Sequence, residues 1–221
     1  MKRKALFVLL LLLVIPLSSA SAHHPIWGDS LKPIEIDSIA TSYAFYQTLQ
    51  ADKVDVFYFE GEQGDNFHAG IQIPDIDALR DYGLSIALFG QGLPQPEASQ
   101  LPQDYPKDLG ALIAPTTVSE DFFEPITQSN YWGRQQINTT LPADGTYYIL
   151  VWHPNGKAGK YVMDTGYEEN FGLLDLFLMP VWWVRVQIYQ QYYARLIIVL
   201  SIIALAIGFF IYRRFRSRHV N

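Results

Sequence analysis

The pattern of hydrophobic and polar positions divides this chain into three parts. An apolar run follows three basic residues at the N-terminus, and a second apolar run lies near the C-terminus. Between them, short β-branched and aromatic segments are separated by Gly, Pro, Asn and Asp, and no long helix-period segment occurs before Asn170. Such a pattern is typical of an all-β domain.

The middle part predicts a single β-sandwich, jelly-roll-like ectodomain over residues 42–169, after an N-terminal extension over residues 23–41. The segment Val54–Glu60 has apolar residues on both faces, which favours a position in the middle of the sandwich. Residues 90–106 and Glu120–Trp132 are predicted to be loops. The predicted strands are Ser42–Leu49, Val54–Glu60, Asn66–Ile73, Leu84–Phe89, Gly110–Ala114, Arg134–Leu141, Thr146–His153 and Lys160–Thr165.

The N-terminal run has the features of a secretory signal peptide. A basic start (2–4) precedes the apolar segment Ala5–Leu17, which is short for a membrane span, and Ala20 and Ala22 provide small residues at a cleavage site. We therefore predict a signal peptide over residues 1–22 and a mature N-terminus at His23. An uncleaved signal anchor is the alternative.

The C-terminal apolar run, Leu196–Tyr212, is long enough to cross a bilayer when its flanks help to anchor it. Arg213, Arg214, Arg216 and Arg218 follow it directly. The positive-inside bias then predicts a single-pass type I protein of the cell membrane, with the span at residues 194–212, a cytoplasmic tail at 213–221 and an extracytoplasmic N-terminus. The alternative is a buried core helix, for which the remaining chain is small.

Aromatic residues are dense just before this run, as in the aromatic belt of a membrane interface. We expect residues 170–179 to be a connector, Pro180 to lie in the first turn of a helix, and that helix to run nearly unbroken through Val181–Tyr212. The candidate membrane-interface residues are Trp182, Trp183, Tyr189, Tyr192, Tyr193 and Arg195.

Charge separates the middle of the chain from its ends. All 22 Asp and Glu residues lie between residues 23 and 180, together with only seven of the 16 Lys and Arg residues, so this part carries a net charge of about −15. Nucleic acid is therefore not an expected partner. The chain has no Cys, so its core must be stable without disulfides.

Several motifs resemble the pre-peptidase C-terminal type of bacterial β-sandwich. They are the strand and turn Asp55–Asp65, the segment Leu84–Phe89, the strand Leu141–Tyr148 with its Gly-Thr-Tyr-Tyr sequence, and the closing Gly159–Tyr161. The likeness covers residues 42–166. Ser85 stands where that family often has a carboxylate, so a family-like calcium site is not expected. The resemblance implies an accessory binding or stabilising module.

Histidines supply the candidate metal chemistry. A mature N-terminal His23 offers an amine and an imidazole to one ion, a chelate that suits Cu(II). His24, His68 and His153 are further candidate ligands, although nothing in the sequence brings them together. Incidental polar histidines are the alternative interpretation.

Aromatic residues supply the candidate partner surface, namely Phe122, Phe123, Tyr131 and Trp132, which flank a polar segment. The sequence contains no G-x-S-x-G, H-E-x-x-H or phosphate-binding glycine loop, and we expect no enzymatic activity and no required cofactor. Two hypotheses result: a membrane-anchored module that binds a protein or glycan outside the cytoplasm, or an extracytoplasmic copper-binding protein.

Overall fold

A computed structural model describes residues 23–28, 32–97, 99, 101–102, 105–115, 120–125 and 127–218. The predicted signal peptide and its cleavage site lie outside the described residues. The chain forms two compact units, which divide between Phe171 and Gly172, and each is described by itself.

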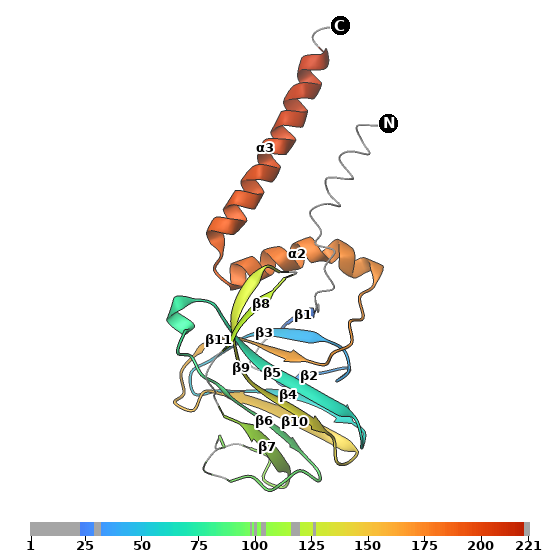
Figure 1. Ribbon diagram of the computed structural model, residues 1–221, viewed down its shortest axis with the longest axis vertical. Helices are drawn as coiled ribbons and strands as arrows, with labels where there is room; N and C mark the ends of the chain where they lie inside the picture. The colour runs from blue at the N-terminus through green and yellow to red at the C-terminus, as the bar shows by residue number, and fades with distance from the viewer. Residues whose placement is uncertain are drawn as a thin grey trace. The chain divides into compact units, whose positions relative to one another are not determined.

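The first unit is a β-sandwich of two sheets, which confirms the predicted fold class (Figure 1). Within the described residues, one sheet has six strands and the other five, and most neighbours pair antiparallel. The six-stranded sheet has the order β1 (His24–Trp27), β3 (Tyr43–Leu49), β11 (Gly159–Thr165), β5 (Asn66–Pro74), β9 (Ser129–Thr140) and β8 (Glu120–Glu124). The five-stranded sheet has the order β2 (Ile34–Glu35), β4 (Val54–Gly61), β10 (Gly145–Trp152), β6 (Ser85–Gly90) and β7 (Gly110–Ala114).

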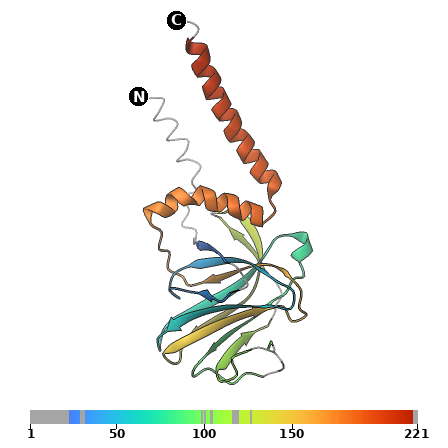
Figure 2. The ribbon, with the colours of Figure 1, turned by 180° about the vertical axis from the view of Figure 1, so that it is seen from behind.

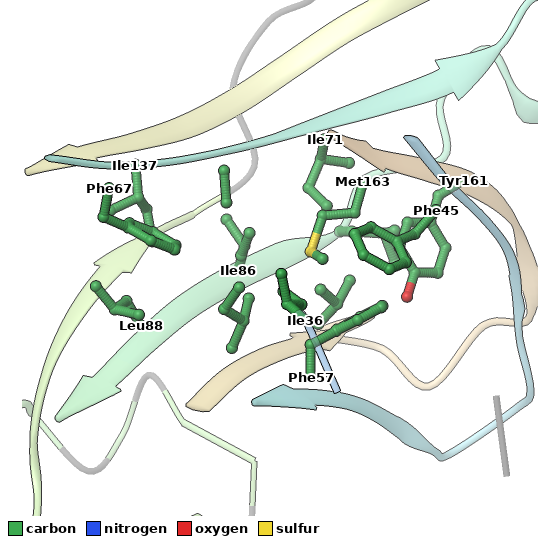
Figure 3. Packing of buried hydrophobic residues seen from close by; sticks show 14 of the residues in the cluster. Ile36, Phe45, Phe57, Phe67, Ile71, Ile86, Leu88, Ile137, Tyr161 and Met163 are labelled. Carbon is green, nitrogen blue, oxygen red and sulfur yellow. The ribbon is translucent and has the colours of Figure 1, made fainter. Parts of the chain in front are cut away.

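The core lies between the two sheets and is rich in aromatic rings (Figure 3). Phe57 and Phe59 point inward from β4 because alternate residues of a strand share one face. The ring of Phe59 stacks between Phe67 and Tyr147, with ring centroids 5.2 and 5.4 Å away. This burial stabilises the unit without any disulfide.

A second apolar cluster explains why β4 is hydrophobic on both faces. Val54 and Val56 pack with Leu150 and Trp152 on the side of β4 opposite Phe57. The segment between β6 and β7 contributes Leu101, Tyr105 and Leu109 to this cluster. The Pro-rich loop therefore covers the outer face of the five-stranded sheet, and β4 has a buried surface on each side.

Two predictions about the strands are wrong. The expected loop Glu120–Trp132 is instead a β-hairpin of β8 and the first part of β9. The expected N-terminal extension contains two short strands, since β1 and β2 pair in parallel with β3 and β4. A strand of two to four residues has little periodicity of its own and is defined by the neighbour it pairs with.

The second unit contains two helices, α2 (Leu173–Tyr189) and α3 (Tyr193–Arg218), instead of the predicted unbroken helix (Figure 2). The chain turns at Gln191, whose φ of 61° lies in the left-handed region. The expected connector is also wrong, because α2 already begins at Leu173. The Asp175 carboxylate accepts a 2.7 Å hydrogen bond from the Gly172 N–H and so caps the start of this helix. Pro180 consequently lies inside α2.

Candidate recognition cleft

A cleft of about 820 Å³ lies where the β8–β9 hairpin meets the segment between β5 and β6. This segment includes the short 3-10 helix η1 (Asp77–Leu79). The volume is within the range of small-ligand and side-chain pockets. The lining residues are Asp75, Arg80, Asp81, Gly83, Asp121, Phe122, Phe123, Asn130, Tyr131, Trp132 and Arg134.

The hairpin brings together the four aromatic residues predicted to contact a partner. Antiparallel pairing sets Phe122 opposite Tyr131, with their ring centroids 6.3 Å apart. In the neighbouring pair, Trp132 lies opposite Asp121. Their exposure differs strongly. Phe122 and Phe123 are 38% and 55% exposed, whereas Tyr131 and Trp132 are 2% and 8% exposed. Phe122 and Phe123 are therefore the accessible aromatic side chains at the cleft, on opposite faces of β8, and the other two rings are buried beside them.

The buried aromatic residues are held by specific contacts. The hydroxyl of Tyr131 lies 3.3 Å from the hydroxyl of Tyr46 on β3. The guanidinium of Arg80 lies over the ring of Trp132, 5.7 Å from its centroid, within the range of a cation–π contact. The backbone N–H of Asp75 donates to the carbonyl of Asn130, which joins the end of β5 to the hairpin.

Arg80 and Arg134 are the only arginines between residues 23 and 180, and both line this cleft. The Arg134 side chain donates a hydrogen bond to the carbonyl of Arg80 and so links β9 to the residue after η1. Burial lowers the pKa of Arg134, and the negative charge of Asp81 opposes that shift. The two guanidiniums thus have fixed surroundings.

Three carboxylates complete the lining. Asp75 and Asp81 come from the β5–β6 segment, and Asp121 comes from β8. With two arginines beside them, the cleft presents both signs of charge around an aromatic surface. The sequence analysis did not identify these five charged residues as parts of a site. The signal that could have found the two arginines is that they are the only ones in a strongly acidic segment of the chain.

His68 lies elsewhere, on the face of β5 opposite the core residues Phe67 and Ala69. Its Nε2 lies 2.8 Å from Oδ2 of Asp164, and its Nδ1 lies 2.7 Å from Oδ1 of Asn138. Since both acceptors are oxygens that do not donate here, the protonated imidazolium fits this site. Burial lowers the pKa of His68, but the hydrogen bond and charge of Asp164 outweigh it, so the pKa is raised.

The structure does not bring the four candidate metal-ligating histidines together. His23 Nδ1 lies 2.5 Å from the Ser42 hydroxyl, and His24 Nε2 lies 2.8 Å from the carbonyl of Asn170. His153, at the end of β10, accepts a hydrogen bond from the N–H of Asn155. In the described ranges, no group of three or more His, Cys, Asp or Glu side chains is placed to hold a metal ion.

The candidate membrane-interface residues lie on both helices of the second unit and, for Tyr192, in the turn between them. Trp182 and Trp183 are half-buried on α2, and Tyr189 is 9% exposed near its end. The Arg195 guanidinium lies over the Tyr192 ring, 4.7 Å from its centroid. Tyr193 opens α3 and is exposed. Among the described helices, the one containing Tyr193–Arg216 is long and apolar enough to cross a membrane.

No family model matches the chain, and no characterised protein matches it in sequence. Several solved structures do match this chain in fold. This chain is similar in structure to a pre-peptidase C-terminal domain, as its motifs predict. That domain, from a Bacillus anthracis collagenase, is 14% identical, with a TM-score of 0.31 over 60% of this chain and 92% of that one.

Two other similar structures have the same kind of fold. PliG of Salmonella Typhimurium, a periplasmic inhibitor of g-type lysozyme, is 16% identical, with a TM-score of 0.37 over 62% of this chain and 99% of its own. CorA of Methylomicrobium album BG8, a surface-associated copper-binding protein, is 10% identical, with a TM-score of 0.34 over 62% of this chain and 98% of its own.

Proposed function

We propose that this protein is a membrane-anchored, extracytoplasmic binding module that recognises a protein partner through the cleft at the β8–β9 hairpin. One observation carries the proposal. The only two arginines between residues 23 and 180, a segment with a net charge of about −15, lie in one cleft beside two exposed phenylalanines. Arginine and aromatic side chains are the residues enriched at the energetic centres of protein interfaces.

The anchor is helix α3. Its apolar segment, within Tyr193–Arg216, has a mean hydropathy of 2.7 and is followed by arginines. With the N-terminal signal peptide, these residues favour a single crossing of the cell membrane, with the sandwich outside and the tail in the cytoplasm. The bilayer is thus the first partner of the protein.

A protein partner fits the cleft better than a glycan does. Sugar rings stack on open aromatic faces, but the larger rings of Tyr131 and Trp132 are buried, and Arg80 lies over the Trp132 ring. The accessible surface consists of Phe122 and Phe123 with acidic and basic groups around them. An apolar centre with a rim of both charges is the usual composition of a protein interface.

A further feature also favours a polypeptide. Strand β8 forms one edge of the six-stranded sheet, and among the described residues no strand pairs with the other side of its backbone. Extended segments of partner proteins pair with such edges, and the adjacent side-chain pockets provide specificity. Phe123, on this edge strand, is more than half exposed.

The test uses the full-length protein in mild detergent. A photo-activatable cross-linker at Phe123 is expected to give one discrete protein adduct in native membranes. When the same labelled protein also carries Phe122→Ser and Arg134→Gln, this adduct is expected to disappear. Gln63→Ser, on the exposed turn between β4 and β5, is the matched control and is expected to leave the adduct intact. Thermal melts of every variant establish that the fold is retained.

Two results would contradict this function. An adduct that survives both cleft substitutions would place the partner on another surface. Binding of the purified ectodomain to an oligosaccharide array, lost in the Phe122→Ser variant, would replace the protein partner with a glycan.

A further inference from the structure

Helix α2 carries an exposed apolar stripe along its length. Leu173, Leu174, Phe177, Val181 and Ile188 are 79%, 69%, 79%, 54% and 47% exposed. Their spacing of three, four and seven residues places them on one face of a helix with 3.6 residues per turn. The opposite side of α2 has the buried residues Val186, Gln187 and Tyr189. Soluble proteins rarely expose a continuous apolar surface of this kind.

The position of α2 along the chain identifies what covers this stripe. Only Gln190, Gln191 and Tyr192 separate the end of α2 from the start of α3. If α3 spans the membrane, the end of α2 therefore lies at the membrane surface. The left-handed turn at Gln191 breaks the helix axis there, so α2 does not continue the direction of the span (Figures 1 and 2).

We infer that α2 is an interfacial helix that lies flat on the outer surface of the bilayer, with its apolar stripe inserted below the lipid headgroups. This inference rests on the proposed anchoring by α3. If α2 stood upright, Leu173 would lie about 22 Å farther out than Ile188 and would meet water. A flat orientation places the whole stripe at one depth, which is the arrangement of interfacial amphipathic helices.

The charge of α2 indicates how it binds. Asp175 and Arg185 are its only charged residues, so anionic lipid gains little electrostatic attraction from it. Apolar burial is the main source of affinity. The helix is therefore expected to insert equally into neutral phosphatidylcholine vesicles and into vesicles with added phosphatidylglycerol.

The absence of cysteine from the sequence makes a direct depth measurement possible. Single nitroxide labels at Leu174→Cys, Phe177→Cys, Val181→Cys and Ile188→Cys in the full-length protein, reconstituted into these vesicles, are compared for collisions with oxygen and with a water-soluble nickel complex. All four labels are expected at one shallow depth, about 5–10 Å below the headgroups. Leu205→Cys, in the middle of α3, marks the hydrocarbon, and Gln63→Cys marks water.

The outcomes separate the two proposals. If the label at Leu205 is in hydrocarbon but those at Phe177 and Val181 are in water, the interfacial helix is overturned and the anchor is retained. A stripe that binds a protein partner instead of lipid would give this result. Depth that increases steadily from Leu174 to Ile188 also overturns it. If the label at Leu205 is in water, the anchor itself fails.

A substitution provides a second measurement. Phe177→Glu with Val181→Glu is expected to move the label at Leu174 from the interface into water, because a carboxylate on the stripe opposes insertion. The matched control is Arg185→Gln, which adds no carboxylate to α2 and is expected to leave that label at its original depth. Equal depths in both variants would contradict the flat orientation.

Discussion

The hydroxyl of Tyr161 donates a 2.7 Å hydrogen bond to Oδ2 of Asp55 inside the sandwich. The two residues are 0% and 2% exposed. Asp55 shares the core-facing side of β4 with Phe57 and Phe59. Burial raises the pKa of Asp55 to about 6, although the hydrogen bond from Tyr161 acts in the opposite direction. The core therefore favours the neutral carboxylic acid.

This raised pKa predicts that the first unit is more stable at pH 5 than at pH 7.5. The unfolded carboxyl has its ordinary pKa of 3.8, so the contribution is fully present below 3.8 and is lost as pH rises through about 6. Its full size is roughly 3 kcal/mol, of which about half is lost between pH 5 and pH 7.5. Denaturant unfolding of residues 23–171 across this range measures it. Asp55→Asn is expected to reduce the slope, while the exposed Asp37→Asn is not, and an unchanged slope in Asp55→Asn would refute the assignment.

Asp164 is predicted to control the protonation of His68. Asp164→Asn removes the negative charge and weakens the hydrogen bond to Nε2, so the pKa of His68 should fall. Imidazole signals in an NMR titration report this directly, and His153, whose pKa burial lowers, serves as the internal reference. Because the pKa of folded His68 is raised, its stabilising effect is present below its unfolded value of 6.5 and is lost as pH rises through the folded one. The same pKa for His68 in both proteins would show that the pair is not coupled.

Gly90 and Tyr147 are predicted to be coupled in stability. A Cβ at Gly90 would lie 2.1 Å from the Tyr147 ring, so Gly90→Ala should destabilise the sandwich by about 1–3 kcal/mol. Tyr147→Ala, at a fully buried side chain, should cost roughly 2–4 kcal/mol. The double variant is expected to be more stable than the sum of the two effects implies, since the smaller residue leaves room for the new methyl group. Strict additivity in denaturant unfolding would mean that the ring and the β6 backbone do not meet.

Membrane topology gives a fourth prediction. A reporter fused after Asn221 should be active in the cytoplasm, because the arginines after the span favour that side. Protease added outside intact cells should digest the sandwich and leave the tail protected. Replacing Arg213, Arg214, Arg216 and Arg218 with Gln is the matched variant and should weaken this orientation. An exposed tail in the unaltered protein would reverse the assignment.

Copper binding gives a fifth prediction, limited to the N-terminus. If cleavage occurs after Ala22, the His23 amine and imidazole should bind one Cu(II) per chain. Acetylation of that amine should abolish binding, and His68→Gln with His153→Gln should not affect it, because the structure places those two side chains on other partners. N-terminal sequencing and metal titration of the mature protein test whether this copper site exists. A chain that begins at Met1, or one without stoichiometric copper, removes this site.

The aromatic candidates show how far the sequence pattern reaches. It places Phe122, Phe123, Tyr131 and Trp132 on either side of a polar segment, but it predicts a loop where the structure has a β-hairpin. The polar residues of β8 and of the tip obscured its alternation, and pairing with the long strand β9 defines it. Arg80 and Arg134, which are joined by a hydrogen bond in the cleft, are 54 positions apart in the chain. Only tertiary contact brings them into one cleft.

The sequence by itself determined the features that depend on local pattern. The all-β class followed from period-two alternation, the two buried faces of β4 from apolar residues on both sides of the strand, and the apolar C-terminal helix from length and composition. Only the tertiary structure decided which distant residues meet, because β-sheet neighbours are chosen by packing over many strands at once. It therefore separated the histidines, paired Asp55 with Tyr161, and assembled the cleft. It also broke the expected long helix, since a single left-handed residue, Gln191, redirects the chain between two helical segments.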